Sequence, residues 1–316
     1  MAAHWMRRSF LAVACASAAL LAACGSSTTE SAFTPTRLVS FGDATADVGQ
    51  QGALYTVNNG SINNWILQIA SLYGLSLKPV SAGGMGYAQG NARVLATPDA
   101  AGGSAPTLAQ QIDSFVASQQ FGDGDLVMLS IGVSDIVAGM MAVRAGTQSE
   151  DQFVAAATQA GKDLATQVRR LTQAGAQHIL LTGTYDLSRT PWGKEIQQES
   201  LLSRASTSFN NALLVNITDL SKNVLYVDAA YYINVFEGSS GGYGFDHNDT
   251  PVCTSVDAGA GIGIGAGEVN SLLCNANTLV ADANADRYLF ADKVYTTPNA
   301  QRQLGNYAYD RLRVRW

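Results

Sequence analysis

The hydrophobic positions of this chain follow two alternating patterns. Short, almost wholly apolar runs predict buried strands, because a strand covered on both faces has no side to expose to water. Longer stretches carry apolar residues three and four positions apart and predict amphipathic helices. The predicted strands span 37–41, 125–132, 178–185 and 223–230, and the predicted helices span 62–74, 107–119, 150–174, 193–220 and 298–313.

The order of these elements predicts the fold class. Strands separated by helices need crossover connections, which build parallel sheets with helices on both faces. We therefore expect one α/β domain over residues 36–316, a three-layer α/β/α sandwich with a mostly parallel, flavodoxin-like sheet. Ser149 and Pro298 are placed to begin helices, and Gly175 to end one. Residues 237–270 are rich in Gly and Ser and are expected to form a long inserted loop.

The N-terminal part of the chain differs from the rest. Arg7 and Arg8 precede an Ala-rich apolar run that is too short to span a bilayer and is followed by small residues. This pattern predicts a secretory signal peptide over residues 1–23. Residues 21–24, Leu-Ala-Ala-Cys, resemble a bacterial lipobox, which implies cleavage before Cys24 and acylation of its sulfur. An ordinary signal peptide followed by a chance cysteine is the alternative.

The lipobox interpretation places the protein in the bacterial cell envelope. Residues 24–35 are rich in Ser, Thr and Ala and are expected to be a flexible tether. Gly25 stands where lipoproteins retained in the inner membrane carry Asp, which favours the outer membrane. The expected partner is therefore a membrane, reached through a lipid anchor on Cys24.

Composition restricts the other partners. The 316 residues carry a formal net charge of −6 with no basic cluster along the sequence, which argues against nucleic acid as a partner. Cys253 and Cys274 would lie in an oxidising compartment, so a disulfide between them is expected, with two independent thiols as the alternative. His178 and His247 lack ligand spacing to these cysteines, so neither a metal site nor a cofactor is expected.

Four short motifs follow predicted strands or precede predicted helices. They are FGDATADVG (41–49), GYAQGNARV (86–94), IGVSDI (131–136) and YLFADKVYTTP (288–298). We expect all four to lie in loops. Because the carboxyl ends of parallel strands share one edge of a sheet, these distant loops are expected to meet there.

The order and wording of these motifs resemble the SGNH/GDSL family of lipases and esterases, over residues 37–313. The resemblance implies hydrolysis of ester bonds. In that family the first motif supplies a serine nucleophile, the second and third supply a Gly and an Asn that donate to the oxyanion, and the last supplies Asp and His. A serine hydroxyl needs a base to take its proton, and the base needs a carboxylate to orient it.

The two groups that perform this chemistry are missing here. Ala44 occupies the nucleophile position and Tyr295 the base position, while Asp292 remains as the orienting carboxylate. Tyrosine has an ordinary pKa of about 10 and is a poor base at neutral pH. A lone change of Ser to Ala would suggest an engineered substrate trap, but several departures together favour natural degeneration. The resemblance therefore implies a catalytically impaired protein, a pseudoenzyme.

The oxyanion side of the site is expected to be partly retained. Asp43 and Gly90 match the family, and Gly90 is expected to offer its backbone N–H, whereas Ser134 replaces the Asn. A retained groove would bind an acyl, lipid or glycan ligand. Two alternatives stay open: an active ester hydrolase or acyltransferase with a relocated nucleophile such as Ser134 beside His247, and a structural envelope lipoprotein. The simplest interpretation of Asp43 and Asp292 is that both are scaffold residues binding loop backbone.

Overall fold

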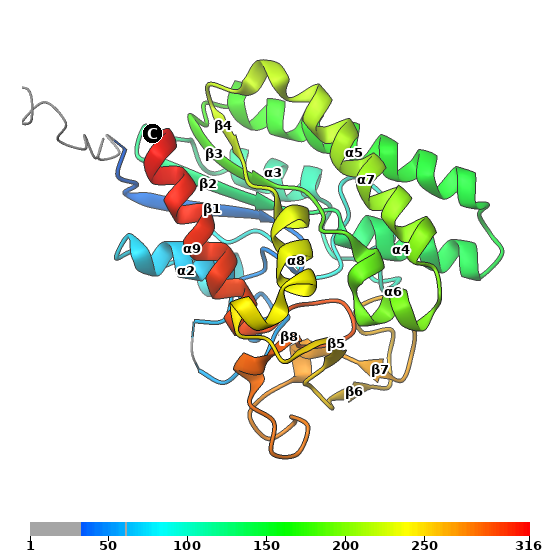
Figure 1. Cartoon of the computed structure of the whole chain (residues 1–316). Coiled ribbons are helices and arrows are strands. Elements are labelled where there is room, and N and C mark those ends of the chain that lie inside the picture. The colour runs from blue at the N-terminus through cyan, green and yellow to red at the C-terminus, as the bar shows by residue number, and fades with distance from the viewer. Residues whose placement is uncertain (1–32, 61) are drawn as a thin grey trace, which may run out of the picture.

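A parallel sheet forms the centre of the molecule. The structure is a computed structural model that describes residues 33–60 and 62–316 (Figure 1). The four strands lie in the order β1-β2-β3-β4, and all neighbouring pairs are parallel. They are β1 (Arg37–Gly42), β2 (Asp125–Ser130), β3 (His178–Thr182) and β4 (Val224–Tyr226). The predicted signal peptide and Cys24 lie outside the described residues, as does most of the tether.

A short extended segment continues the sheet beyond β1. Gly86 forms a parallel bridge with Ser40, and the N–H of Tyr87 donates to the carbonyl of Ser40 at 2.7 Å. This segment comes second along the chain but lies outside the first strand, which is the strand order of flavodoxin-like sheets. The predicted sheet type is confirmed.

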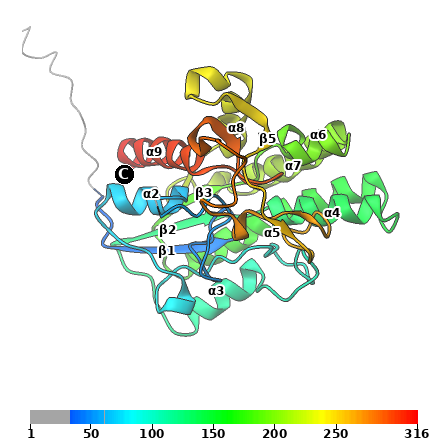
Figure 2. The same ribbon diagram turned by 90° about the horizontal axis from the view of Figure 1, so that it is seen from below.

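Helices cover both faces of the sheet (Figures 1 and 2). They are α2 (Trp65–Leu72), α3 (Leu108–Val116), α4 (Val133–Arg144), α5 (Glu150–Gln173), α6 (Pro191–Glu195), α7 (Glu199–Asn216), α8 (Ala229–Gly238) and α9 (Pro298–Arg315). Leu126 and Met128 of β2 join a core with α2 and α9, whereas Val127 and Leu129 join a second core with α3, α4, α5 and α7. Side chains of a strand alternate between faces, so β2 is buried on both. The three-layer α/β/α architecture is confirmed.

Helix limits follow the local sequence. The hydroxyl of Ser149 accepts the N–H of Gln152 and caps α5, and Thr107 caps α3 in the same way. Gly175, with a φ of +106°, follows the end of α5, and Pro298 begins α9.

Three expectations about secondary structure were wrong. The stretch 193–220 is split into α6 and α7, with Gln197 at a φ of +55° between them. The expected strand 223–230 stops at Tyr226, and α8 follows. The third motif does not lie in a loop, because α4 begins at Val133. The first two turns of α4 are buried nearly all round, so they show no amphipathic period that the sequence could reveal.

The predicted inserted loop is a small folded layer. It contains β5 (His247–Pro251), β6 (Val256–Asp257) and β7 (Glu268–Val269), and β5 pairs with β8 (Tyr288–Phe290). Cys253 and Cys274 form the expected disulfide, with their Cα atoms 5.8 Å apart. Within the described part of the chain, no helix is both long and apolar enough to cross a membrane.

Candidate functional site: a filled catalytic edge

Two glycines end the neighbouring strands β1 and β2. Gly42 has a φ of +141°, and a Cβ added to it would lie 1.9 Å from the carbonyl oxygen of Ser130. Gly132 has a φ of +132°, and its Cβ would lie 2.7 Å from the ring of Phe209. Only glycine fits either turn. The two turns lie side by side, and the N–H of Asp43 donates to the carbonyl of Ser130 at 3.0 Å.

The carboxylate of Asp43 links the first motif to the third. One of its oxygens accepts the backbone N–H and the hydroxyl of Thr45, at 3.0 and 2.7 Å. The other accepts the N–H groups of Gly132 and Ser134, at 3.1 and 3.5 Å, at the N-terminus of α4. Burial raises the pKa of the Asp43 carboxyl, and these donors oppose that rise. Asp43 therefore acts as a buried backbone acceptor.

The carboxylate of Asp292 has the same role in the last motif. One oxygen accepts the N–H groups of Val294 and Tyr295, at 2.8 and 2.6 Å, and the other accepts the N–H of Ser271 at 3.1 Å. Asp292 is fully buried, and burial raises the pKa of its carboxyl. Its oxygens orient loop backbone rather than an imidazole.

The N–H of Gly90 is not free, contrary to our expectation for an oxyanion donor. It donates at 2.9 Å to the carboxylate of Asp47, which also accepts the N–H groups of Gly49 and Gln50 at 2.8 Å each. A Cβ at Gly90 would lie 1.9 Å from the hydroxyl oxygen of Tyr55, so Tyr55 lies directly against this glycine. An oxyanion hole needs donors that face open space, and here that space is filled.

Buried aromatic side chains surround the nucleophile and base positions. Tyr295 is 1% exposed and meets Tyr55 edge to face, with ring centroids 5.5 Å apart. The hydroxyl of Tyr185 donates to the carbonyl of Val294 at 2.7 Å. Ala44 is 2% exposed and belongs to the same hydrophobic cluster. Burial and the nearby carboxylate of Asp43 raise the pKa of Tyr295 well above its ordinary value, so its hydroxyl stays protonated at neutral pH.

The alternative pair of Ser134 and His247 is not assembled. Ser134 is 1% exposed, and its hydroxyl has no hydrogen-bond partner among the described residues. His247 begins β5 at the surface and stacks on Tyr288, with centroids 4.1 Å apart. His178 begins β3, at the opposite end of the strand from the motifs, and stacks on Phe33.

Three buried hydroxyls lie at the carboxyl ends of the strands. Ser130 and Thr182 are the last residues of β2 and β3, and Thr45 follows β1. The hydroxyls of Thr45 and Ser130 lie 2.7 Å apart, and Thr182 donates to Ser130 at 2.6 Å. A cavity of about 20 Å³ adjoins them, which is enough for one water molecule. This cavity is too small for an ester substrate.

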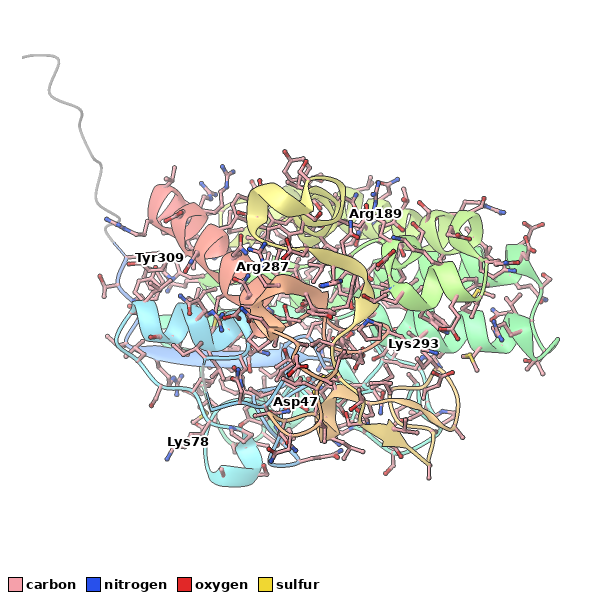
Figure 3. The ribbon with its side chains drawn as sticks, turned by 60° about the horizontal axis from the view of Figure 1, so that its bottom comes forward. Asp47, Lys78, Arg189, Arg287, Lys293 and Tyr309 are labelled. Atoms are coloured by element: carbon pink, nitrogen blue, oxygen red, sulfur yellow. A yellow bond between two sulfur atoms is a disulfide. The ribbon has the colours of Figure 1, made fainter. Side chains whose placement is uncertain are left out.

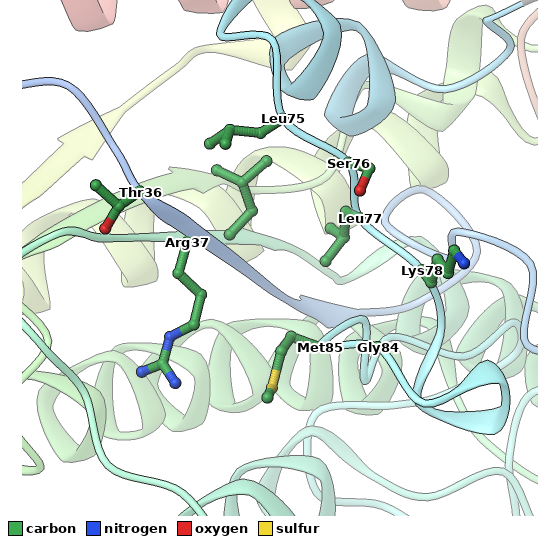
Figure 4. A pocket seen from close by; sticks show the side chains of 9 residues that line it. Thr36, Arg37, Leu75, Ser76, Leu77, Lys78, Gly84 and Met85 are labelled. Atoms are coloured by element: carbon green, nitrogen blue, oxygen red, sulfur yellow. The ribbon is translucent and has the colours of Figure 1, made fainter.

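A larger cavity of about 230 Å³ lies elsewhere, beside the first half of β1 (Figure 4). Thr36, Arg37 and Leu38 line one side, and residues 75–78 line another. It is at the opposite end of β1 from Ala44. No group of three or more His, Cys, Asp or Glu residues in 33–60 and 62–316 could hold a metal ion.

Ion pairs fasten the last motif to its surroundings. Lys293 contacts Glu195 of α6 at 2.7 Å and Glu268 of β7 at 2.6 Å. Figure 3 labels Lys293 and the buried Asp47 in the region where the motif loops and the folded insertion meet. Within the site, the N–H of Ser134 donates to Asp43, and Tyr55 contacts both Tyr295 and Gly90.

Comparisons with known proteins identify the family of this chain. A family model described as GDSL-like Lipase/Acylhydrolase matches residues 38–308. The chain belongs to that family. A curated Pseudomonas putida relative, described as "Uncharacterized protein in trpE-trpG intergenic region", is 26% identical over 162 residues. The match covers 51% of this chain and 26% of the relative, so this chain spans about a quarter of that protein's length. A solved crystal structure aligns over 89% of this chain and 97% of its own, with 14% identity and a TM-score of 0.46, too low to support an argument.

Tyr55 and Ser271 are the site residues that sequence reasoning missed. Both lie outside the four motifs, and each acts through a contact made only in the fold: Tyr55 against Gly90, and Ser271 with Asp292. No spacing in the sequence marks either residue.

Proposed function

We propose that this protein is a lipid-anchored outer-membrane member of the GDSL family that does not hydrolyse esters. One observation carries the proposal: the catalytic positions are substituted and also packed shut. Ala44 and Tyr295 cannot supply a nucleophile and a base, and the N–H of Gly90 is held by Asp47 beneath Tyr55.

The same packing argues against a groove for an acyl, lipid or glycan ligand at the family site. Ala44, Ser134 and Tyr295 are each at most 2% exposed. It also argues against a relocated esterase, since a nucleophile must meet its substrate. The role that fits best is structural: a rigid GDSL domain held in the cell envelope.

Ester hydrolysis is the first test. Purified protein should neither hydrolyse short p-nitrophenyl esters nor react with a fluorophosphonate probe. The double variant Ala44→Ser/Tyr295→His should also stay inactive, because Tyr55 still covers Gly90. Turnover by the unmodified protein that disappears in Ser134→Ala would replace this proposal with the relocated-nucleophile esterase.

The lipid anchor needs a separate test. Its support is the Leu-Ala-Ala-Cys sequence at 21–24, and Gly25 favours the outer membrane. Mass spectrometry of the N-terminal peptide should find an acylated Cys24, and Cys24→Ser should release the protein from the outer-membrane fraction. An unmodified Cys24 would refute the anchor without affecting the catalytic proposal.

A further inference from the structure

Four cations gather at one end of the fold, contrary to our expectation of no basic cluster, and three of them lie within residues 311–315. Arg311, Arg313 and Arg315 are exposed on the last turns of α9. Arg315 donates to the carbonyl of Ser221, which places the exposed Lys222 beside it. We call Arg311, Arg313, Arg315 and Lys222 the basic end.

The basic end is poorly neutralised. Within residues 33–60 and 62–316, none of its four side chains forms an ion pair with a carboxylate. Asp310 on α9 and Asp123 near His178 are exposed acidic groups at the same end. The cations outnumber them, in a chain whose net charge is −6.

Apolar side chains accompany these cations. Val314 lies on the solvent face of α9 and is 85% exposed. Trp316 is half-buried and meets His178 edge to face at 4.9 Å. Arginines around an exposed aliphatic side chain and a tryptophan are typical of surfaces that lie in the headgroup region of a bilayer.

The basic end also lies where the described chain begins. The N–H of Phe33 donates to the carbonyl of Trp316 at 3.0 Å, and Figures 1 and 2 both show the end of α9 beside the start of β1. Cys24 is nine residues before Phe33. Since an extended chain spans at most about 3.6 Å per residue, a segment of nine residues reaches at most roughly 32 Å.

We propose that the basic end docks on anionic phospholipid headgroups and orients the domain on the membrane. Guanidinium groups bind phosphate oxygens in pairs, and arginines near an anionic bilayer are attracted to it. This inference rests on the proposed lipid-anchored function. The anchor confines the protein to a bilayer, and the basic end selects which surface of the domain faces it.

Vesicle flotation of the full chain tests this inference. The measured quantity is the ratio of binding to phosphatidylcholine vesicles with and without added phosphatidylglycerol, because a lipid anchor contributes equally to both. The ratio should be about tenfold or more, and should fall towards one in Arg311→Gln/Arg313→Gln/Arg315→Gln. The matched control Arg144→Gln/Lys162→Gln/Arg204→Gln, on α4, α5 and α7, should keep the ratio.

A second measurement needs no variant. Phenylglyoxal labelling followed by mass spectrometry should slow several-fold at the three arginines of α9 in anionic vesicles, but not at Arg144. An unchanged ratio in the α9 variant would overturn the inference and leave these arginines as partners of the helix C-terminus. Equal loss in the control variant, or equal labelling in both vesicle types, would also overturn it. The mass of the N-terminal peptide reports on the anchor independently.

Discussion

The first and last motif loops solve one structural problem in different ways. Both place a fully buried carboxylate among backbone N–H groups, Asp43 in the first loop and Asp292 in the last. Asp43 is held by the ends of the sheet and the start of α4, all within the main domain. Asp292 reaches out to Ser271, in the layer braced by the disulfide of Cys274.

The difference shows that these two carboxylates are tied to the fold, whatever chemistry the site performs. A catalytic side chain can be replaced at little cost in stability, whereas replacing a buried carboxylate leaves its three or four donors without an acceptor. The presence of Asp43 and Asp292 therefore reports the integrity of the fold rather than activity. The following experiments test this view of the two loops.

Removing either carboxylate should have the largest effect. Asp43→Ala and Asp292→Ala leave buried N–H groups without acceptors, at about 1–3 kcal/mol per group. We expect each to lower the free energy of unfolding by about 3 kcal/mol or more, measured by urea denaturation. Asp249→Ala, at an exposed position, is the control. A near-neutral Asp292→Ala would mean that the last loop does not depend on its carboxylate.

Filling the space beside Gly90 should have the next largest effect. Gly90→Ala should destabilise the protein by about 1–3 kcal/mol, because the new methyl group collides with Tyr55. In a Tyr55→Ala background the same change should cost much less. Thermal or urea unfolding of all four proteins forms a double-mutant cycle. Additive effects would show that Tyr55 does not cover Gly90.

The buried carboxyls should make stability depend on pH. Burial raises the pKa of Asp43, Asp47 and Asp292, and raises that of Asp135 to about 6. A folded-state pKa above the unfolded value stabilises the fold at low pH, and this contribution is lost as pH rises through the folded value. The free energy of unfolding should therefore be higher at pH 5 than at pH 7, by on the order of 1 kcal/mol from Asp135 alone.

Urea titrations between pH 5 and 7 measure this dependence, and Asp135→Asn should flatten the profile. Stability that rises steadily from pH 5 to pH 7 would contradict the raised pKa values.

Restoring only the nucleophile should have the smallest effect. Ala44→Ser should leave ester hydrolysis undetectable, because no base stands beside position 44, and should change the free energy of unfolding by less than about 1 kcal/mol. The p-nitrophenyl ester assay and urea denaturation measure the two effects. Measurable turnover would show that a base is present that the structure does not identify.

The sequence predicted most of the fold because the strands carry its clearest signal. The apolar runs that became β1 to β3 and the capped helices α3 and α5 appear where the sequence placed them, whereas β4 is shorter than expected. It did not predict α4, since the first two turns of this helix are buried nearly all round and have no polar face to give them a period. The layer around β5 to β7 was missed because strands of two to five residues carry too little pattern.

The sequence also predicted which positions of the site converge, but not their condition. The sequence alone shows that Ala44 and Tyr295 stand where the family motifs have Ser and His. The space beside Gly90 is filled by Tyr55, and these two residues come into contact only in the folded protein. Local patterns do not encode such long-range packing.

The contact between Tyr55 and Gly90 has an evolutionary consequence. A descendant with serine at position 44, or histidine at position 295, would gain no activity for selection to favour, because Tyr55 would still cover Gly90. Several changes would have to arise together before any advantage appeared. Given the inactive site that we propose, stepwise mutation therefore offers no gradual route to ester hydrolysis, and the fold is free to be shaped by other demands.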